Sequence, residues 1–438
     1  MRPVLVCALA IGLLATGVPS HSEVRLLGIG TLNGSKAGPG MDLSGQTFTL
    51  ENGQAANLLG GIGSGLDYAG KGVFLALPDR GPNAMPYNPA ISDTTSYVSR
   101  FHTLNIRLSP QKTQGELPLR VTPELVGTTL LYSSAPLAYG PGAGSVGRGE
   151  PNSNRTDRFY FSGRADNFSA APQARRDKDA RFDPEAIRLS KDGRSVFISD
   201  EYGPYLRQFD RASGRLIKTF ALPENLAAST LSAVADVEIQ ANRRGRVANK
   251  GMEGLALTPD GKVLVGAMQA ALEQDLAIPA TKKLIRLNVI DIASGRVHQF
   301  GYLLTDGSGV SEILAINSHE FLVLERDGRG LGEDPPAVTK KLYRIDLARA
   351  VDITHLSGEA SLAAVVDKSQ VLDIVEALVA NGTPIEAVPA KMEGLSFGPD
   401  ITLNKRKLHT LFVSNDNDFV SDKSGQNRLY VFGYDRLK

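Results

Sequence analysis

A glutamate recurs at the start of four similar segments of the chain. Each segment runs from this glutamate through an apolar strand and a turn to a second apolar strand that ends in polar or charged residues; the four glutamates are Glu185, Glu253, Glu312 and Glu393. A diverged fifth copy begins at Ser64 and carries no acid there. Gathered carboxylates repel each other unless a cation neutralises them, and calcium accepts six to eight oxygen ligands. The repeated glutamates therefore predict a divalent-metal site, with calcium as the expected ion.

A second group of charged side chains follows the second strand of these copies. Its members are Asp79, Arg80, Asp200, Glu201 and Asp416. Carboxylates at this place can bind a metal or act as a general base, and the planar fork of Arg80 suits an anionic oxygen. We therefore expect Asp79, Arg80, Asp200 and Glu201 to be catalytic and Asp416 to join the four glutamates as a metal ligand. The structural alternative is that the glutamates accept backbone N–H groups and the aspartates form turns.

Two motifs for other kinds of catalysis lack support in the sequence. There is no His-Glu-x-x-His helix, and a Gly-rich run at Gly142–Gly147 continues as a loop without the helix that dinucleotide binding needs. The residue types therefore favour catalysis by carboxylates and a bound metal ion.

The repeats also predict the fold. Short runs rich in Val, Ile, Leu and Phe alternate with Asp-Gly and Pro turns, which is typical of strands and hairpins, and further strands follow in each copy. Four-stranded units in series indicate an all-β protein with a single β-propeller, because one unit cannot bury its own apolar faces. The interval from Ser64 to Glu185 is long enough for two units, so the sequence favours six blades and leaves five open. A pair of β-sandwiches is the alternative, but it does not explain the recurring charges.

The last unit, near the C-terminus, has only three strands in the sequence. Its missing fourth strand is expected at Val24–Ile29, paired with Arg428–Tyr434. Such pairing closes the ring with the two ends of the chain and leaves no exposed sheet edge.

The N-terminus has the pattern of a secretory signal. Arg2 precedes an apolar stretch from Val4 to Val18, followed by small residues at Ser20–Ser22. We expect residues 1–22 to be a signal peptide and residues 23–438 to be one domain, in a periplasmic or secreted protein without a membrane span. The formal net charge is +1, so no overall charge points to nucleic acid.

Several of these segments resemble one family. Asp183-Pro-Glu-Ala-Ile187, Asp200-Glu-Tyr-Gly-Pro204 and Leu77-Pro-Asp-Arg-Gly-Pro82 are similar to the phytase-like family known for "esterase-like activity of phytase", as are the Met-Glu-Gly-Leu segments at Glu253 and Glu393. The resemblance covers nearly all of the mature chain. It implies an exported protein and hydrolysis of esters or phytate-related compounds; it implies no particular catalytic residue.

Three functions remain open from the sequence. The first is a divalent-metal-dependent hydrolase of small phosphate or carboxylic esters, the second a calcium-dependent lactonase-type propeller, and the third a non-catalytic ligand-binding propeller. A binding module would line the channel mouth with aromatic residues, whereas this chain has no Trp and 6% aromatic residues. The composition therefore leans toward an enzyme.

Overall fold

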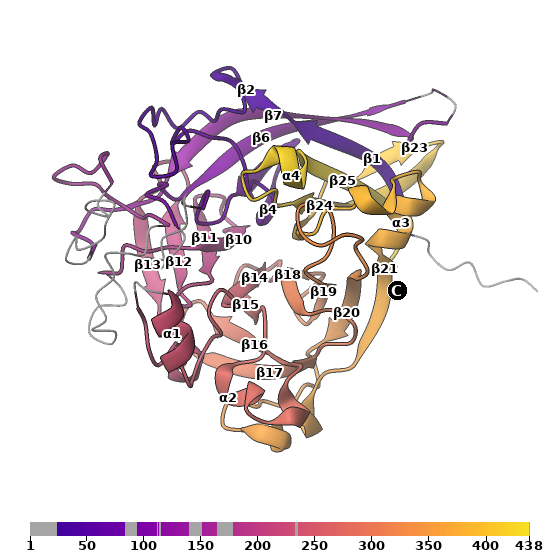
Figure 1. Ribbon diagram of the computed structural model, residues 1–438. Helices are drawn as coiled ribbons and strands as arrows, with labels where there is room; N and C mark the ends of the chain where they lie inside the picture. Colours follow the sequence, from indigo (N-terminus) through magenta and orange to yellow (C-terminus); the bar gives the residue numbers. More distant parts are fainter. Residues whose placement is uncertain are drawn as a thin grey trace, which may run out of the picture.

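The computed structural model describes residues 24–83, 94–111, 113, 115–139, 151–163, 178–232 and 235–437 (Figure 1). The expected signal peptide and the Gly142–Gly147 run lie outside these residues. Four four-stranded antiparallel sheets and one five-stranded antiparallel sheet dominate the described chain.

The sheets follow one another along the chain as blades. Blade 1 comprises β4 (Gly65–Gly70), β5 (Val73–Leu77), β6 (Arg100–Pro110) and β7 (Leu119–Leu130); blade 2 comprises β10 (Pro184–Leu189), β11 (Ser195–Asp200), β12 (Leu206–Asp210) and β13 (Leu216–Phe220). Blade 3 comprises β14 (Met252–Leu257), β15 (Val263–Met268), β16 (Leu284–Asp291) and β17 (Val297–Leu303); blade 4 comprises β18 (Gly309–Ala315), β19 (Glu320–Arg326), β20 (Lys340–Asp346) and β21 (Lys368–Asp373). Blade 5 comprises β22 (Met392–Phe397), β24 (Arg406–Asn415), β25 (Asn427–Tyr434) and β1 (Arg25–Leu32), with β23 (Ile401–Leu403) attached to β24.

The remaining strands and the α-helices of the described residues are short. They are the strand pairs β2 (Gly34–Ser35) with β3 (Gly38–Pro39) and β8 (Tyr132–Ser133) with β9 (Phe159–Tyr160), and the helices α1 (Ala235–Ala241), α2 (Glu273–Leu276), α3 (Ile374–Ala380) and α4 (Ser421–Ser424). None of the helices in these residues is long and apolar enough to cross a membrane.

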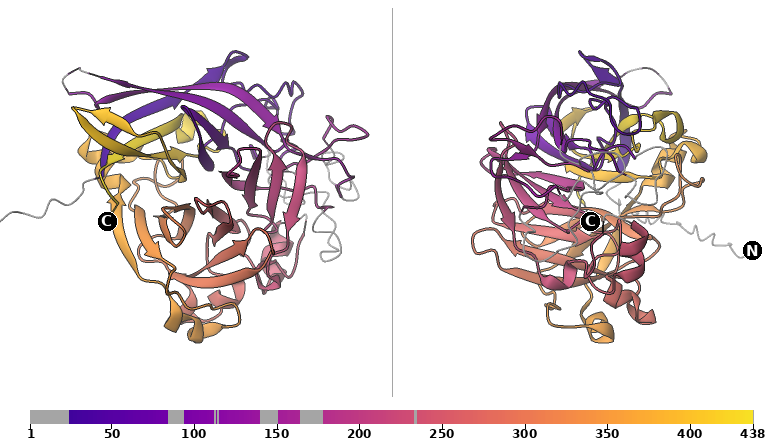
Figure 2. Two further views of the ribbon diagram at one scale, coloured as in Figure 1. Left: turned by 180° about the vertical axis from the view of Figure 1, so that it is seen from behind. Right: turned by 60° about the vertical axis from the view of Figure 1, so that its left-hand side comes forward.

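The blades form a closed ring, so the predicted β-propeller is confirmed. The first strand of each blade contacts the first strand of the next, and β22 contacts β4 (Figures 1 and 2). The ring has five blades, one of the two counts that the sequence left open. In the interval that a sixth blade would have used, the described residues form the twelve-residue outer strand β7 and the small β8–β9 pair.

The two ends of the chain close the ring, as predicted. β1 pairs antiparallel with β25, with Arg25 opposite Gly433 and Leu32 opposite Asn427. The last blade therefore takes its outer strand from the N-terminal end of the chain.

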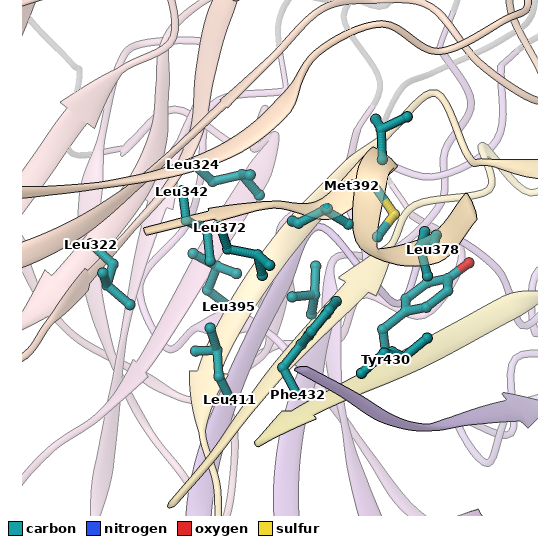
Figure 3. Close-up of a cluster of buried hydrophobic side chains, with 14 of the residues drawn as sticks. Leu322, Leu324, Leu342, Leu372, Leu378, Met392, Leu395, Leu411, Tyr430 and Phe432 are labelled. Carbon is teal, nitrogen blue, oxygen red and sulfur yellow. The ribbon is translucent and has the colours of Figure 1, made fainter. Parts of the chain in front are cut away.

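Apolar side chains between neighbouring blades form the core. Figure 3 shows one such cluster, where Leu322 and Leu342 of blade 4 and Leu378 of α3 pack toward Leu411 and Phe432 of blade 5. The inner strands are buried along almost their whole length, because each lies between two other blades. A charged side chain on such a strand must find a partner inside the ring or at its end.

Candidate functional site

The register of the inner hairpins determines which residues are equivalent from blade to blade. Pro184 pairs with Asp200, Met252 with Met268 and Met392 with Asn415, so Glu185, Glu253 and Glu393 follow equivalent residues. In blade 4 the equivalent pair is Val310 with Glu325. Ser311 therefore occupies the glutamate position of that blade, and Glu312 lies one residue further along.

Glu312 consequently does not join the other three glutamates, and the sequence prediction was wrong in placing it with them. Its carboxylate lies 2.8 Å from the guanidinium of Arg188 and accepts hydrogen bonds from the backbone N–H groups of Leu255 and Ile313. The one-residue offset arises because the sequence pattern Glu-x-Leu fits two registers, whereas the strand pairing allows only one.

A group of three buried carboxylates lies at one end of the ring. Carboxylate oxygens of Asp183, Glu185 and Glu201 all lie within 4.8 Å of one another. Glu201 comes directly after β11, and Asp183 and Glu185 lie at the start of β10, so the pairing of these two strands brings them together. We call these three residues the first acidic group.

Electrostatics show that the two glutamates of the first acidic group have no directly paired cation. Burial and then the neighbouring carboxylate of Glu253 raise the pKa of Glu185 well above its usual range. Burial and Asp183 raise the pKa of Glu201 to about 7, against the opposing effect of Arg80. Within the described residues, neither Glu185 nor Glu201 has a hydrogen-bond or ion-pair partner for its carboxylate.

Glu253 adds a fourth carboxylate beside this group. One of its oxygens accepts a hydrogen bond from the Gln269 side chain at 2.8 Å, and the other is buried without a partner. Burial, followed by the charges of Glu201 and Glu393, raises the pKa of Glu253 well above its usual range. An orphaned buried oxygen among like charges is the environment that a cation would relieve.

A second acidic group already contains a cation. Carboxylate oxygens of Asp79, Asp416 and Asp418 lie within 4.8 Å of one another. The ammonium of Lys391 lies 3.4 Å from Asp416 and is also bonded to Asp418. Burial raises the pKa of Asp79 to about 7 despite the nearby Arg80. The lysine thus neutralises part of this group from within the chain.

Two arginines connect these acids. Arg80 lies 3.3 Å from Asp183 and 3.9 Å from Asp79, so it joins the two acidic groups. Arg326 lies 2.7 Å from Glu393 and 3.5 Å from Glu253. It ends β19 in blade 4, whose inner strand has Ser311 where blades 2, 3 and 5 have a glutamate. A blade without the acid at this position therefore supplies a cation to the glutamates of two other blades.

Asp200 has a different position from the one expected of a catalytic residue. It is fully buried, and its two oxygens accept hydrogen bonds from the backbone N–H groups of Asp183 at 2.8 Å, Gly203 at 2.6 Å and Tyr205 at 3.0 Å. These bonds fix the loop that carries Glu201 and the start of β10. Asp200 is a positioning residue, because both of its carboxylate oxygens accept hydrogen bonds from backbone N–H groups.

The structure thus brings together most, but not all, of the predicted residues. Asp79, Arg80, Glu185, Glu201, Glu253, Glu393 and Asp416 lie at this end of the ring, whereas Glu312 and Asp200 serve elsewhere. Sequence reasoning missed Asp183, Arg326, Lys391 and Asp418 as members of the site. The sequence feature that could have identified them is their position in the repeats. Asp183 and Lys391 each stand two residues before a repeated glutamate, Arg326 ends a second strand and Asp418 follows one.

Comparison with known proteins identifies the family of this chain. The family model "Phytase-like: Esterase-like activity of phytase" matches residues 57–419. The chain belongs to this family. A curated relative from Arthroderma benhamiae, named "Uncharacterized secreted protein", is 26% identical over 228 residues, which are 44% of this chain and 44% of the relative. The match therefore spans less than half of either protein.

Solved structures give only distant likenesses. A luciferin-regenerating enzyme aligns over 85% of this chain and 92% of its own, at 11% identity and a TM-score of 0.35. Kuenenia stuttgartiensis hydrazine synthase aligns over 86% and 80%, at 9% identity and a TM-score of 0.34.

Proposed function

We propose that this member of the phytase-like family is a divalent-metal-dependent hydrolase of small phosphate or carboxylic esters, with its active site at the acidic end of the propeller. The observation that carries the proposal is the first acidic group, in which the carboxylates of Glu185 and Glu201 find no partner among the residues that the structure describes. One oxygen of the neighbouring Glu253 is likewise buried without a partner. Buried carboxylates without partners are costly, and a bound cation is the usual remedy.

The donor set suits calcium or a similar hard ion. Asp183, Glu185, Glu201 and Glu253 supply only carboxylate oxygens, which hard cations prefer over the nitrogen and sulfur ligands typical of zinc. When bound, such an ion polarises an ester oxygen and acidifies water. The second acidic group is a weaker candidate, because Lys391 already provides its cation.

The remaining charged residues have roles that fit a hydrolase. The guanidinium of Arg80 lies between the two acidic groups and can bind an anionic oxygen of the substrate in a bidentate fashion. Asp79 is the proposed general base, since its pKa of about 7 lets it accept a proton from water near neutral pH. Glu393 forms an ion pair with Arg326, and Asp416 forms one with Lys391. These two acids would support the metal ligands from their neighbouring positions.

The test is metal analysis combined with a substrate panel. The mature chain would be assayed on p-nitrophenyl phosphate, a p-nitrophenyl carboxylic ester and a lactone, with calcium, magnesium, manganese or chelator. We expect hydrolysis of at least one acyclic ester that chelator abolishes, and Glu253→Gln to weaken metal binding. Glu325→Gln is the control, because Glu325 is equally buried but bonds to Tyr302 and Lys368 away from the acidic groups. Full activity in excess chelator would contradict the proposal.

Export is part of the proposal. It is supported by the Arg2 and Val4–Val18 pattern and by the relative's name, which calls that protein secreted. N-terminal sequencing of the exported protein should find a start near residue 23; an intact N-terminus in the cytosol would contradict export.

A further inference from the structure

A buried ion pair crosses the inside of the ring beneath the acidic groups. Arg188 of β10 and Glu312 of β18 lie 2.8 Å apart, and both residues are almost inaccessible to solvent, at 2% and 0% exposure. Nothing in the proposed reaction requires this pair, and replacing a buried ion pair by apolar residues is often neutral or stabilising. Its presence calls for a role beyond stability.

The pair is bonded to the inner strands of four blades. Arg188 donates to the carbonyl oxygens of Leu66 in blade 1 at 2.8 Å, Ile187 in its own blade at 2.7 Å and Ile313 in blade 4 at 3.1 Å. Glu312 accepts from the N–H of Leu255 in blade 3 at 2.9 Å. The neighbouring Ser311 donates to the carbonyl of Met392 in blade 5 at 3.0 Å, so the fifth blade is tied to the same place.

These contacts lie directly below two of the proposed metal ligands. Ile187 is two residues after Glu185, and Leu255 is two residues after Glu253, which corresponds to roughly 7 Å along a strand. Glu185 and Glu253 belong to different blades, so their separation depends on how β10 and β14 are held relative to each other. Arg188 holds β10, and Glu312 holds β14.

We propose that Arg188 and Glu312 are positioning residues that set the separation of Glu185 and Glu253, and thereby the affinity of the site for a divalent cation. The inference rests on the proposed metal-dependent function. Residues that orient metal ligands from behind typically change metal affinity by about 10–100-fold when they are mutated. Arg188 and Glu312 join four blades at one level of the ring, and they can therefore orient the metal ligands in this way.

The experiment measures calcium affinity and melting temperature of the mature chain. Arg188→Met should weaken calcium binding, measured by isothermal titration calorimetry, about 10–100-fold. Arg188→Lys keeps the charge but cannot reach three carbonyl groups at once, so it should restore only part of the affinity. The matched control is Arg286→Met: Arg286 is as buried as Arg188 and pairs with Asp275 at 3.0 Å, but it lies on β16, away from the inner strands. The control should lower the melting temperature and leave calcium affinity at the wild-type value.

Each outcome separates the possibilities. If Arg188→Met does not fold, the near-isosteric Glu312→Gln carries the same expectation with a smaller loss. Wild-type calcium affinity in folded Arg188 and Glu312 variants would overturn the inference and leave the proposed function intact. An equal loss of affinity in Arg286→Met would also overturn it, because the effect would then be general destabilisation. A wild-type protein that binds no divalent cation would overturn the proposed function and, with it, this inference.

Discussion

Two consecutive residues stand at or shortly after the end of the second strand of each blade, and in blades 2, 4 and 5 these two residues have different partners. The first binds the backbone of nearby loops: Asp200 accepts from three N–H groups, Glu325 from Thr305 and Gly307, and Asn415 from Arg428. The second reaches toward the acidic end of the ring; these residues are Arg80, Glu201, Gln269, Arg326 and Asp416. Adjacent side chains on an extended chain face opposite sides, which is why Asp200 binds the backbone whereas Glu201 joins the first acidic group.

The first prediction concerns Asp200. In Asp200→Asn, one oxygen is replaced by an NH₂ group that would face a backbone N–H, so at least one buried donor loses its partner. We expect the free energy of unfolding to fall by about 1–3 kcal/mol, measured from urea denaturation. Asp157→Asn, at an exposed site, serves as the control and should leave the midpoint unchanged. Wild-type stability of Asp200→Asn would contradict the positioning role.

A pH dependence is expected from His102, which is buried in blade 1 beside the ion pair of Arg100 and Asp42. Its Nδ1 lies 2.9 Å from the Thr128 hydroxyl, and burial lowers its pKa to about 4. The unfolded chain, with a pKa of about 6.5, takes up the proton first. Stability from the neutral ring is therefore complete above about pH 6.5 and is lost as the pH falls toward 4, by at most about 3 kcal/mol.

The variant His102→Asn isolates this effect. Asn keeps a polar atom near Thr128 but does not titrate, so the stability difference between wild type and variant should shrink as the pH falls from 6.5 to 4. Denaturation midpoints across this range measure it, with exposed His355→Asn as the control. A difference that stays constant with pH would rule out the buried neutral histidine.

At the scale of elements, the sequence predicted the strands but not the register shifts between them. Apolar runs of five to eight residues between Asp-Gly turns predicted the strands of each blade, and the incomplete last unit predicted that β1 closes the ring. Each inner hairpin of blades 2 to 5, however, has a register shift close to its start, after the first residue pair in blades 2, 3 and 5 and after the second in blade 4. Such a bulge leaves no clear trace in Val310-Ser311-Glu312, so the wrong residue was aligned with Glu253.

The closing strand gives a prediction at this scale. Deleting residues 24–32 removes the partner of β25 and exposes an unpaired sheet edge, so we expect a lower melting temperature and aggregation in light scattering. A circular permutant is the control: Arg25 lies opposite Gly433, so a short linker can join residues 434 and 25 as a hairpin, with new ends in the exposed turn at Ala293–Ser294. The permutant should melt near the wild-type temperature. A deletion variant as stable as wild type would show that closure is dispensable.

For the whole molecule, the acidic end of the ring is the place where blades far apart in sequence meet. Blade 1 supplies Asp79, blade 2 the first acidic group, blade 3 Glu253 and blade 5 Asp416. The repulsion among these groups works against ring closure, while Arg80, Arg326 and Lys391 offset part of it. A cation bound by Glu185 and Glu253 would link blades 2 and 3 directly, so metal binding and ring stability should be coupled.

The last prediction follows from this coupling. A ligand that binds only the folded state stabilises it by mass action, so calcium at about 100 times its dissociation constant should add about 2.7 kcal/mol to the free energy of unfolding. The melting temperature should therefore rise with calcium concentration and fall to a plateau in excess chelator, as measured by calorimetry. Glu253→Gln should need more calcium for the same rise, whereas the control Glu325→Gln should melt lower throughout but respond to calcium as the wild type does. Identical melting curves in calcium and chelator would mean that the unpartnered carboxylates of blades 2 and 3 are neutralised by protonation, and that the ring needs no metal to close.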